Sequence, residues 1–108
     1  MEFQGVWSVY EMEMWNEEYF NMEVQAFIKI NHDGSGEFQF GLVTGDFIGK
    51  VIDQNDNEKF TFKWVGTDEL EPVNGIGWIE IINEDLIEGE FIFYDGEESK
   101  FKARKVNC

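Results

Sequence analysis

Apolar and polar residues alternate along most of this sequence, and short polar segments interrupt the alternation at intervals of roughly ten residues. The run from Phe60 to Trp64 is typical, because Phe60, Phe62 and Trp64 alternate with Thr61 and Lys63. A period of two is that of a β-strand with one buried face. The sequence therefore predicts an all-β protein built from short strands.

The number of such runs predicts a closed or nearly closed sheet. About eight short strands with short connections are typical of an antiparallel meander, and an open sheet of that size would expose two unpaired edges. We therefore expect one domain over residues 1–108, folded as a small up-and-down barrel or a strongly curled meander.

Glycine and Asx residues mark where the predicted strands turn. Gly75 and Gly77, just before Trp78, predict a bulge, a sharp bend or a close approach of two backbones, because glycine has no Cβ. The predicted turns and loops lie at residues 31–36, 44–46, 53–58, 67–71, 83–85 and 94–97.

One segment departs from the two-residue period. Met12, Trp15, Tyr19 and Met22 recur at spacings of three and four residues, the spacing of side chains on one face of a helix. We therefore expect a short helical segment near residues 12–22, with Asn16 as a candidate cap at its N-terminus.

The charge of the chain limits its partners. The net charge is −15, from 23 acidic and 8 basic residues, a balance that repels nucleic-acid phosphates and anionic membrane surfaces. The single cysteine is Cys108, which excludes an intrachain disulfide, and no apolar run approaches the roughly 20 residues that span a bilayer. We expect a cytoplasmic protein that binds neither nucleic acid nor membrane.

Residues with catalytic or metal-binding chemistry form no complete motif. His32, the only histidine, lies in a predicted turn, a setting that does not favour a nucleophilic triad. That turn resembles the first half of a calcium-binding loop, but Leu42 occupies the position of the final Glu, so a hairpin is favoured. Asp68, Glu69 and Glu71 form an acidic loop that suits either a hard cation or a capped bend. We expect no catalytic residue, metal site or cofactor.

The aromatic residues, which make up 17% of the chain, are the strongest candidates for a binding site. Trp15, Tyr19, Trp64 and Trp78 are large side chains that need a hydrogen-bond partner when buried, so some of them are expected to line a pocket or an exposed patch. The competing interpretation is a core of large residues in a small barrel. In the first case, the acidic loop 68–71 forms a polar rim around the aromatic site.

Several short motifs spread over most of the chain resemble a family of small, mostly bacterial all-β proteins of unassigned function. The resemblance implies a compact β domain and supplies no activity, substrate or catalytic residue. Ile76 and the 94–97 segment differ from the Arg and the His-x-Gly-Asp step of the family pattern. The motifs are Gly5-x-Trp7, Glu11-Met12 with Trp15 and Tyr19-Phe20, Gly36-x-Phe38-x-Phe40-Gly41, Phe62-x-Trp64-x-Gly66-x-Asp68-Glu69, and Gly75-x-Gly77-Trp78.

Three hypotheses for function follow. The first is a noncatalytic binding module whose aromatic-lined barrel mouth receives a small apolar ligand or a partner peptide. The second is an enzyme of unknown type, because a barrel can host chemistry with few residues. The third is an acidic inhibitor or decoy that presents carboxylates to a basic protein; its candidate residues are Glu11, Glu13, Glu17, Glu18 and Glu23. The sequence leaves the oligomeric state open.

Overall fold

The structure is a computed structural model that describes residues 2–54 and 57–106. Cys108 and part of the predicted loop 53–58 therefore lie outside the described residues. The elements are β1 (Gly5–Met12), α1 (Glu17–Phe20), β2 (Phe27–Ile30), β3 (Ser35–Phe40), β4 (Val43–Gln54), β5 (Asn57–Asp68), β6 (Glu71–Asn83), β7 (Leu86–Phe93) and β8 (Glu98–Lys105).

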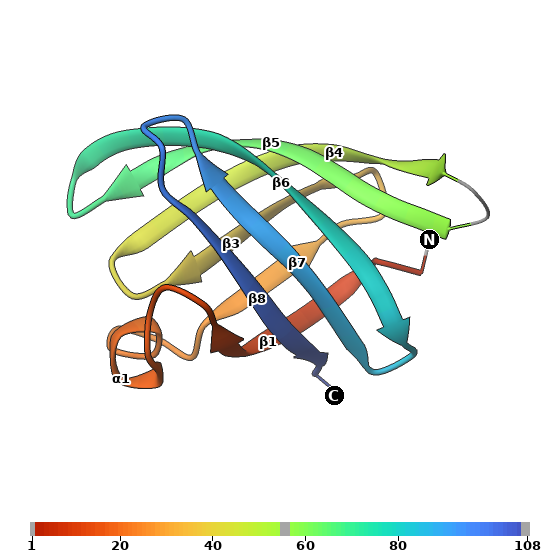
Figure 1. Cartoon of the computed structure of the whole chain (residues 1–108), viewed down its shortest axis with the longest axis horizontal. Helices are drawn as coiled ribbons and strands as arrows, with labels where there is room; N and C mark the ends of the chain where they lie inside the picture. The colour runs from red at the N-terminus through yellow and green to blue at the C-terminus, as the bar shows by residue number, and fades with distance from the viewer. Residues whose placement is uncertain (1, 55–56, 107–108) are drawn as a thin grey trace.

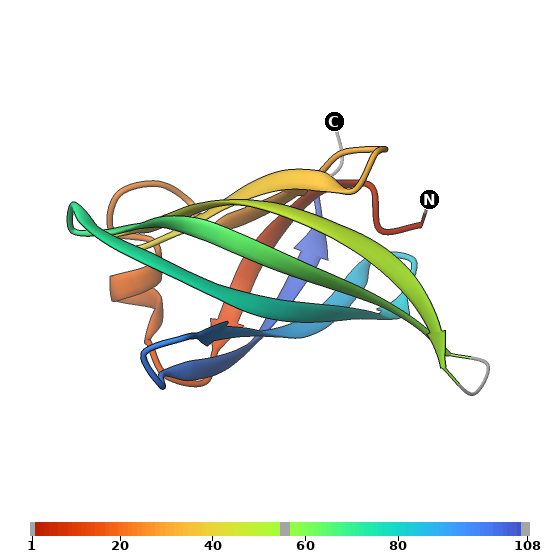
Figure 2. The same ribbon diagram turned by 90° about the horizontal axis from the view of Figure 1, so that it is seen from above.

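The strands form a closed antiparallel barrel in sequence order (Figures 1 and 2). Each strand pairs with the next along the chain, and β8 pairs with β1, which leaves no sheet edge open. The all-β fold, the antiparallel barrel of eight strands and the short helix near the N-terminus are confirmed.

Side chains from one face of every strand fill the interior of the barrel. In β8, Ser99, Phe101 and Ala103 are buried while Lys100 and Lys102 point outward, as the alternation predicts. Aromatic rings from different strands meet in the middle of the barrel. The ring centroids of Phe38 on β3 and Phe91 on β7 are 4.5 Å apart, and those of Phe62 on β5 and Phe91 are 6.1 Å apart.

Glycines make room for these rings. Gly49, Phe62 and Gly77 are partners in one cross-strand row of β4, β5 and β6. A Cβ at Gly77 would collide with the ring of Phe62 and with the carbonyl of Glu90. The close approach predicted at Gly75 and Gly77 is therefore confirmed, and the pairing register continues through both residues without a bulge.

The predicted turn at residues 44–46 is wrong. The chain turns at Gly41, whose φ is 57°, and Gly45 lies inside β4. Gly45 is an inward position beside the ring of Phe38, which occupies the space that a side chain would need. A glycine that admits a neighbouring ring has the same signature in the sequence as a glycine that turns the chain.

The predicted helical segment 12–22 is too long. Met12 belongs to β1, and the helix is restricted to Glu17–Phe20. The predicted cap is confirmed, because the Oδ1 atom of Asn16 accepts a hydrogen bond of 3.1 Å from the backbone N–H of Tyr19. β2 begins at Phe27, after the exposed Val24 and the buried Ala26.

The glycine at position 77 offers a test of this packing. We expect Gly77→Ala to lower the free energy of unfolding by about 2 kcal/mol, because the added methyl group overpacks the space beside Phe62. Urea unfolding measures the change. Asn74→Ala, on the outer side of the same strand, is the control and should change stability by less than about 0.5 kcal/mol. Equal stability of Gly77→Ala and the parent protein would contradict this account of the core.

Candidate functional site

α1 lies at one end of the barrel (Figures 1 and 2). Trp15 and Tyr19 are half-buried there and pack against the core. Their rings stack with centroids 6.0 Å apart, and the Trp15 ring lies 5.1 Å from that of Phe40. The Tyr19 ring packs over Gly41, whose backbone N–H donates a hydrogen bond of 2.9 Å to the carbonyl of Phe20. The helical segment therefore packs on the β3–β4 turn and covers this end of the barrel. We call Trp15 and α1, which contains Tyr19, the plug.

Trp64 lies beneath this plug and belongs to the core. Its side chain is 2% exposed, and its ring meets Phe93 edge to face with centroids 5.0 Å apart. The indole Nε1–H donates a hydrogen bond of 3.1 Å to the carbonyl of Ile76. Because the indole finds its partner inside the barrel, Trp64 supports the site from below and offers almost no surface to a ligand.

The predicted polar rim lies at the same end of the barrel. Asp68 ends β5 and pairs with Glu71 at the start of β6, and Glu69 occupies the turn with a φ of 51°. The backbone N–H of Glu69 donates a hydrogen bond of 3.3 Å to the carbonyl of Leu42, which ties the β5–β6 turn to the β3–β4 turn. Asp68 and Glu69 therefore lie near the helical segment.

The rim changes the electrostatics of the plug. Burial raises the pKa of the Tyr19 phenol above its ordinary value of 10.0, and the negative charges of Asp68, Glu69 and Glu97 raise it further. A hydrogen bond with the backbone of Leu42 acts in the opposite direction. Carboxylates from separate turns thus converge on one phenol, which stays neutral at physiological pH.

We call this region the helix end and define it as residues 13–26, 41–42, 68–71 and 94–98. These segments contain no Lys, Arg or His. Met14, Met22 and Leu70 are exposed among the acids, with 55%, 53% and 93% of their surface accessible. The carboxylates of the helix end are Glu13, Glu17, Glu18, Glu23, Asp68, Glu69, Glu71, Asp95, Glu97 and Glu98.

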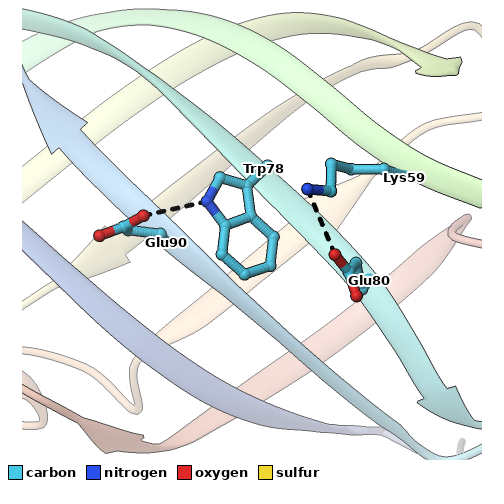
Figure 3. Close-up of polar contacts among 4 residues, drawn as sticks. All are labelled: Lys59, Trp78, Glu80 and Glu90. Atoms are coloured by element: carbon cyan, nitrogen blue, oxygen red, sulfur yellow. Dashed lines mark hydrogen bonds and ion pairs between the residues drawn. The ribbon is translucent and has the colours of Figure 1, made fainter. Parts of the chain in front are cut away.

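Trp78 does not belong to the helix end. It lies on the outer side of β6, where its Nε1–H donates a hydrogen bond of 3.0 Å to Oε1 of Glu90 (Figure 3). The Nζ atom of Lys59 lies 4.7 Å from the centre of its ring and 3.3 Å from a carboxylate oxygen of Glu80. The structure therefore brings together six of the predicted site residues and places Trp78 on a separate surface.

That separate surface is the feature that sequence reasoning missed. Ile48, Lys63 and Ile76 are partners in one cross-strand row, and all three point outward. The sequence contains a signal for this apolar surface, because Ile48 follows the buried Phe47 and Val65 follows the buried Trp64. An apolar residue at the outward position of a strand breaks the alternation and marks an apolar outer face.

The turn that resembles part of a calcium-binding loop is held together by its own hydrogen bonds. Residues 31–34 connect β2 to β3, and Oδ1 of Asp33 accepts hydrogen bonds from the backbone N–H and the hydroxyl of Ser35, at 3.0 and 2.6 Å. These bonds lower the pKa of Asp33. In residues 2–54 and 57–106, no group of three His, Cys, Asp or Glu side chains is arranged to hold a metal ion.

The described part of the chain contains no helix with the length and apolar character needed to cross a membrane.

Comparison of the chain with models of protein families, with curated proteins and with solved structures finds no match. The family resemblance stays a prediction. Function must therefore be inferred from the helix end and the outer face themselves.

The raised pKa of Tyr19 gives a test of the plug. The folded protein holds the phenolic proton more tightly than the unfolded chain, so this contribution to stability is complete below pH 10 and is lost as the pH rises through the folded pKa. We expect the free energy of unfolding to fall more steeply above pH 10 in the parent protein than in Tyr19→Phe. Urea unfolding and phenolate absorbance measure the difference. A Tyr19 phenol that titrates at its ordinary pKa would contradict the docked plug.

Proposed function

We propose that the protein is a noncatalytic binding module whose helix end binds a basic, amphipathic segment of a partner protein. One observation carries the proposal: the helix end combines carboxylates from three separate segments with exposed Met14, Met22 and Leu70, and contains no basic residue. A segment with apolar side chains on one face and Lys or Arg beside them complements both properties.

The apolar residues of the helix end suit a partner of variable shape. Methionine side chains are flexible and polarizable, so Met14 and Met22 can adapt to different apolar groups. Leu70 projects from the tip of the β5–β6 turn with 93% of its surface exposed, and no burial within the barrel explains its apolar character. Contact with a partner would remove this surface from water.

The charge of the chain favours association with a basic partner. The net charge of −15 attracts cations over the Debye length, which is about 8 Å at physiological ionic strength. The concentration of carboxylates at one end would orient the partner as it approaches. The same surface supports the alternative of an acidic inhibitor, because a basic protein bound at the helix end would have its cationic site covered.

The interior of the barrel favours a partner on the surface over a small apolar ligand inside. The rings of Phe38 and Phe91 meet at the centre, and Trp15 covers the end of the barrel above Phe93. A ligand in the barrel would have to displace these rings, at the cost of the core packing. A partner at the helix end displaces only water.

A helical peptide of about 16 residues, with Leu on one face and Lys on the other, tests the proposal. We expect its titration to shift the amide resonances of the helix end. We expect the variant Glu69→Lys to bind it about tenfold more weakly, because an attractive charge becomes repulsive. Leu70→Ser should also weaken binding, through the lost apolar contact.

Glu84→Lys is the matched control, because Glu84 is an exposed acid in the turn at the opposite end of the barrel. This variant should bind the peptide with nearly parental affinity. If Glu84→Lys and Glu69→Lys weaken binding equally, the attraction is due to total charge and the helix end is not the site. The absence of any shift at the helix end would also refute the proposal.

A further inference from the structure

We infer that the outer face of β4, β5 and β6 is a second docking surface, which binds an acidic, amphipathic segment of a protein. We call it the Trp78 face and define it as Ile48, Lys50, Lys59, Lys63, Ile76 and Trp78. This inference is independent of the proposed function, because the two surfaces use different residues and favour partners of opposite charge.

The apolar residues of the Trp78 face are contiguous. Ile48, Lys63, Ile76 and Ile92 are successive partners across β4, β5, β6 and β7. Ile48 is 75% exposed, although the outward positions of a barrel in water are normally polar. Ile76 and Ile92 are direct cross-strand partners, and Lys63, whose aliphatic stem can continue an apolar surface, stands between Ile76 and Ile48. The three isoleucines therefore belong to one patch rather than to the scattered exposed residues that any surface contains.

The face is also hollowed. Two adjoining hollows of about 500 and 570 Å³ both contact Ile48 and Lys63. The first continues to Trp78, and the second to Val65 and Tyr94. Both hollows are shallow and open, and their mainly apolar lining can take up the side chains of a segment docked on the surface.

Trp78 is held in place for such a contact. Its Nε1–H donates to Glu90 and its ring lies under the ammonium group of Lys59, which is held in turn by Glu80 (Figure 3). These contacts come from three strands and fix the ring before any partner arrives. A pre-positioned, half-exposed tryptophan loses little conformational freedom on binding, and tryptophan is enriched among the residues that dominate interfaces.

The charge of the face selects the partner. Lys50, Lys59 and Lys63 line the hollow that contains Trp78, where no carboxylate is among the lining residues, and Asp46 is the one carboxylate that lines the adjoining hollow. Lys59 is paired with Glu80, but Lys50 and Lys63 form no ion pair with any residue in the described ranges. Lysines between apolar side chains match a segment in which Glu or Asp stands beside apolar residues.

The lysines of β8 differ from those of the Trp78 face. Lys102 is opposite Glu88 on β7, and its Nζ atom lies 3.8 Å from a carboxylate oxygen of Glu11 on β1. The acids of the same sheet therefore largely neutralise the basic row of β8. Lys50 and Lys63 of the Trp78 face form no such pair within the described ranges, and salt at about 0.15 M screens the carboxylates of the helix end beyond about 8 Å.

A helical peptide of about 16 residues, with Leu and Phe on one face and Glu on the other, tests the inference at about 0.15 M salt. We expect it to shift the amide resonances of Ile48, Lys63 and Ile76 and the indole N–H resonance of Trp78. We expect Lys63→Glu and Lys50→Glu each to weaken binding about tenfold, because one attractive contact becomes repulsive.

Lys29→Glu is the matched control, since Lys29 is an exposed, outward lysine on β2. Its effect on affinity should be less than twofold. Circular dichroism checks that each variant is folded, and Lys63→Gln provides a milder second change. Equal weakening by Lys29→Glu and Lys63→Glu, or shifts confined to other surfaces, would overturn the inference.

Two further results would also overturn it. If the resonances of the Trp78 face shift with protein concentration in the absence of peptide, a second copy of this chain occupies the face. If the Lys-containing peptide of the previous section shifts the same face, charge does not select the partner. The proposed function is judged separately, from the shifts that this basic peptide causes at the helix end.

Discussion

The fit between aromatic rings and glycines inside the barrel is the interaction on which the rest of the structure depends. A barrel of eight strands has just enough interior for side chains, and here Phe62 fills space that Gly49 and Gly77 leave free on either side of it. A larger residue at either glycine would force the strands apart. The closure of the barrel, the register of its strands and the filling of its core therefore depend on the same thing. In each cross-strand row, they depend on which positions hold a large side chain and which hold glycine.

Because the interior is full, both proposed binding surfaces lie on the outside of the barrel. Trp15 and Tyr19 seal the end at which the acidic turns meet, so that end presents carboxylates and exposed methionines instead of an open mouth. The outer sheet has its own departure from the usual pattern, in which Ile48 and Ile76 take positions that water normally assigns to polar residues. Both surfaces carry apolar area that the fold itself does not require.

The sequence predicts the barrel well because strand parity is a local property. The alternation around Phe101 identifies the inward side of β8 with no knowledge of its neighbours. Prediction from the sequence fails where a glycine can have either of two roles. Gly45 makes room for a ring, whereas Gly41 turns the chain. Prediction also fails at Trp78, because Gly75 and Gly77 occupy the two inward positions before it while Ile76 and Trp78 point outward, so this part of the strand looks inverted. Only the cross-strand row, in which Phe62 fills the space beside Gly77, resolves that ambiguity.

The distribution of charge gives the two surfaces different physical behaviour. The carboxylates of the helix end act together at a distance, so salt should affect mainly the rate at which a basic partner arrives there. The lysines of the Trp78 face sit between isoleucines and beside a fixed indole, in a chain whose net charge is −15. An acidic segment gains nothing from long-range attraction, and its binding must come from contact with Trp78, Lys50 and Lys63. Association at that face therefore depends on fit and burial, which determine how long a complex lasts more than how fast it forms.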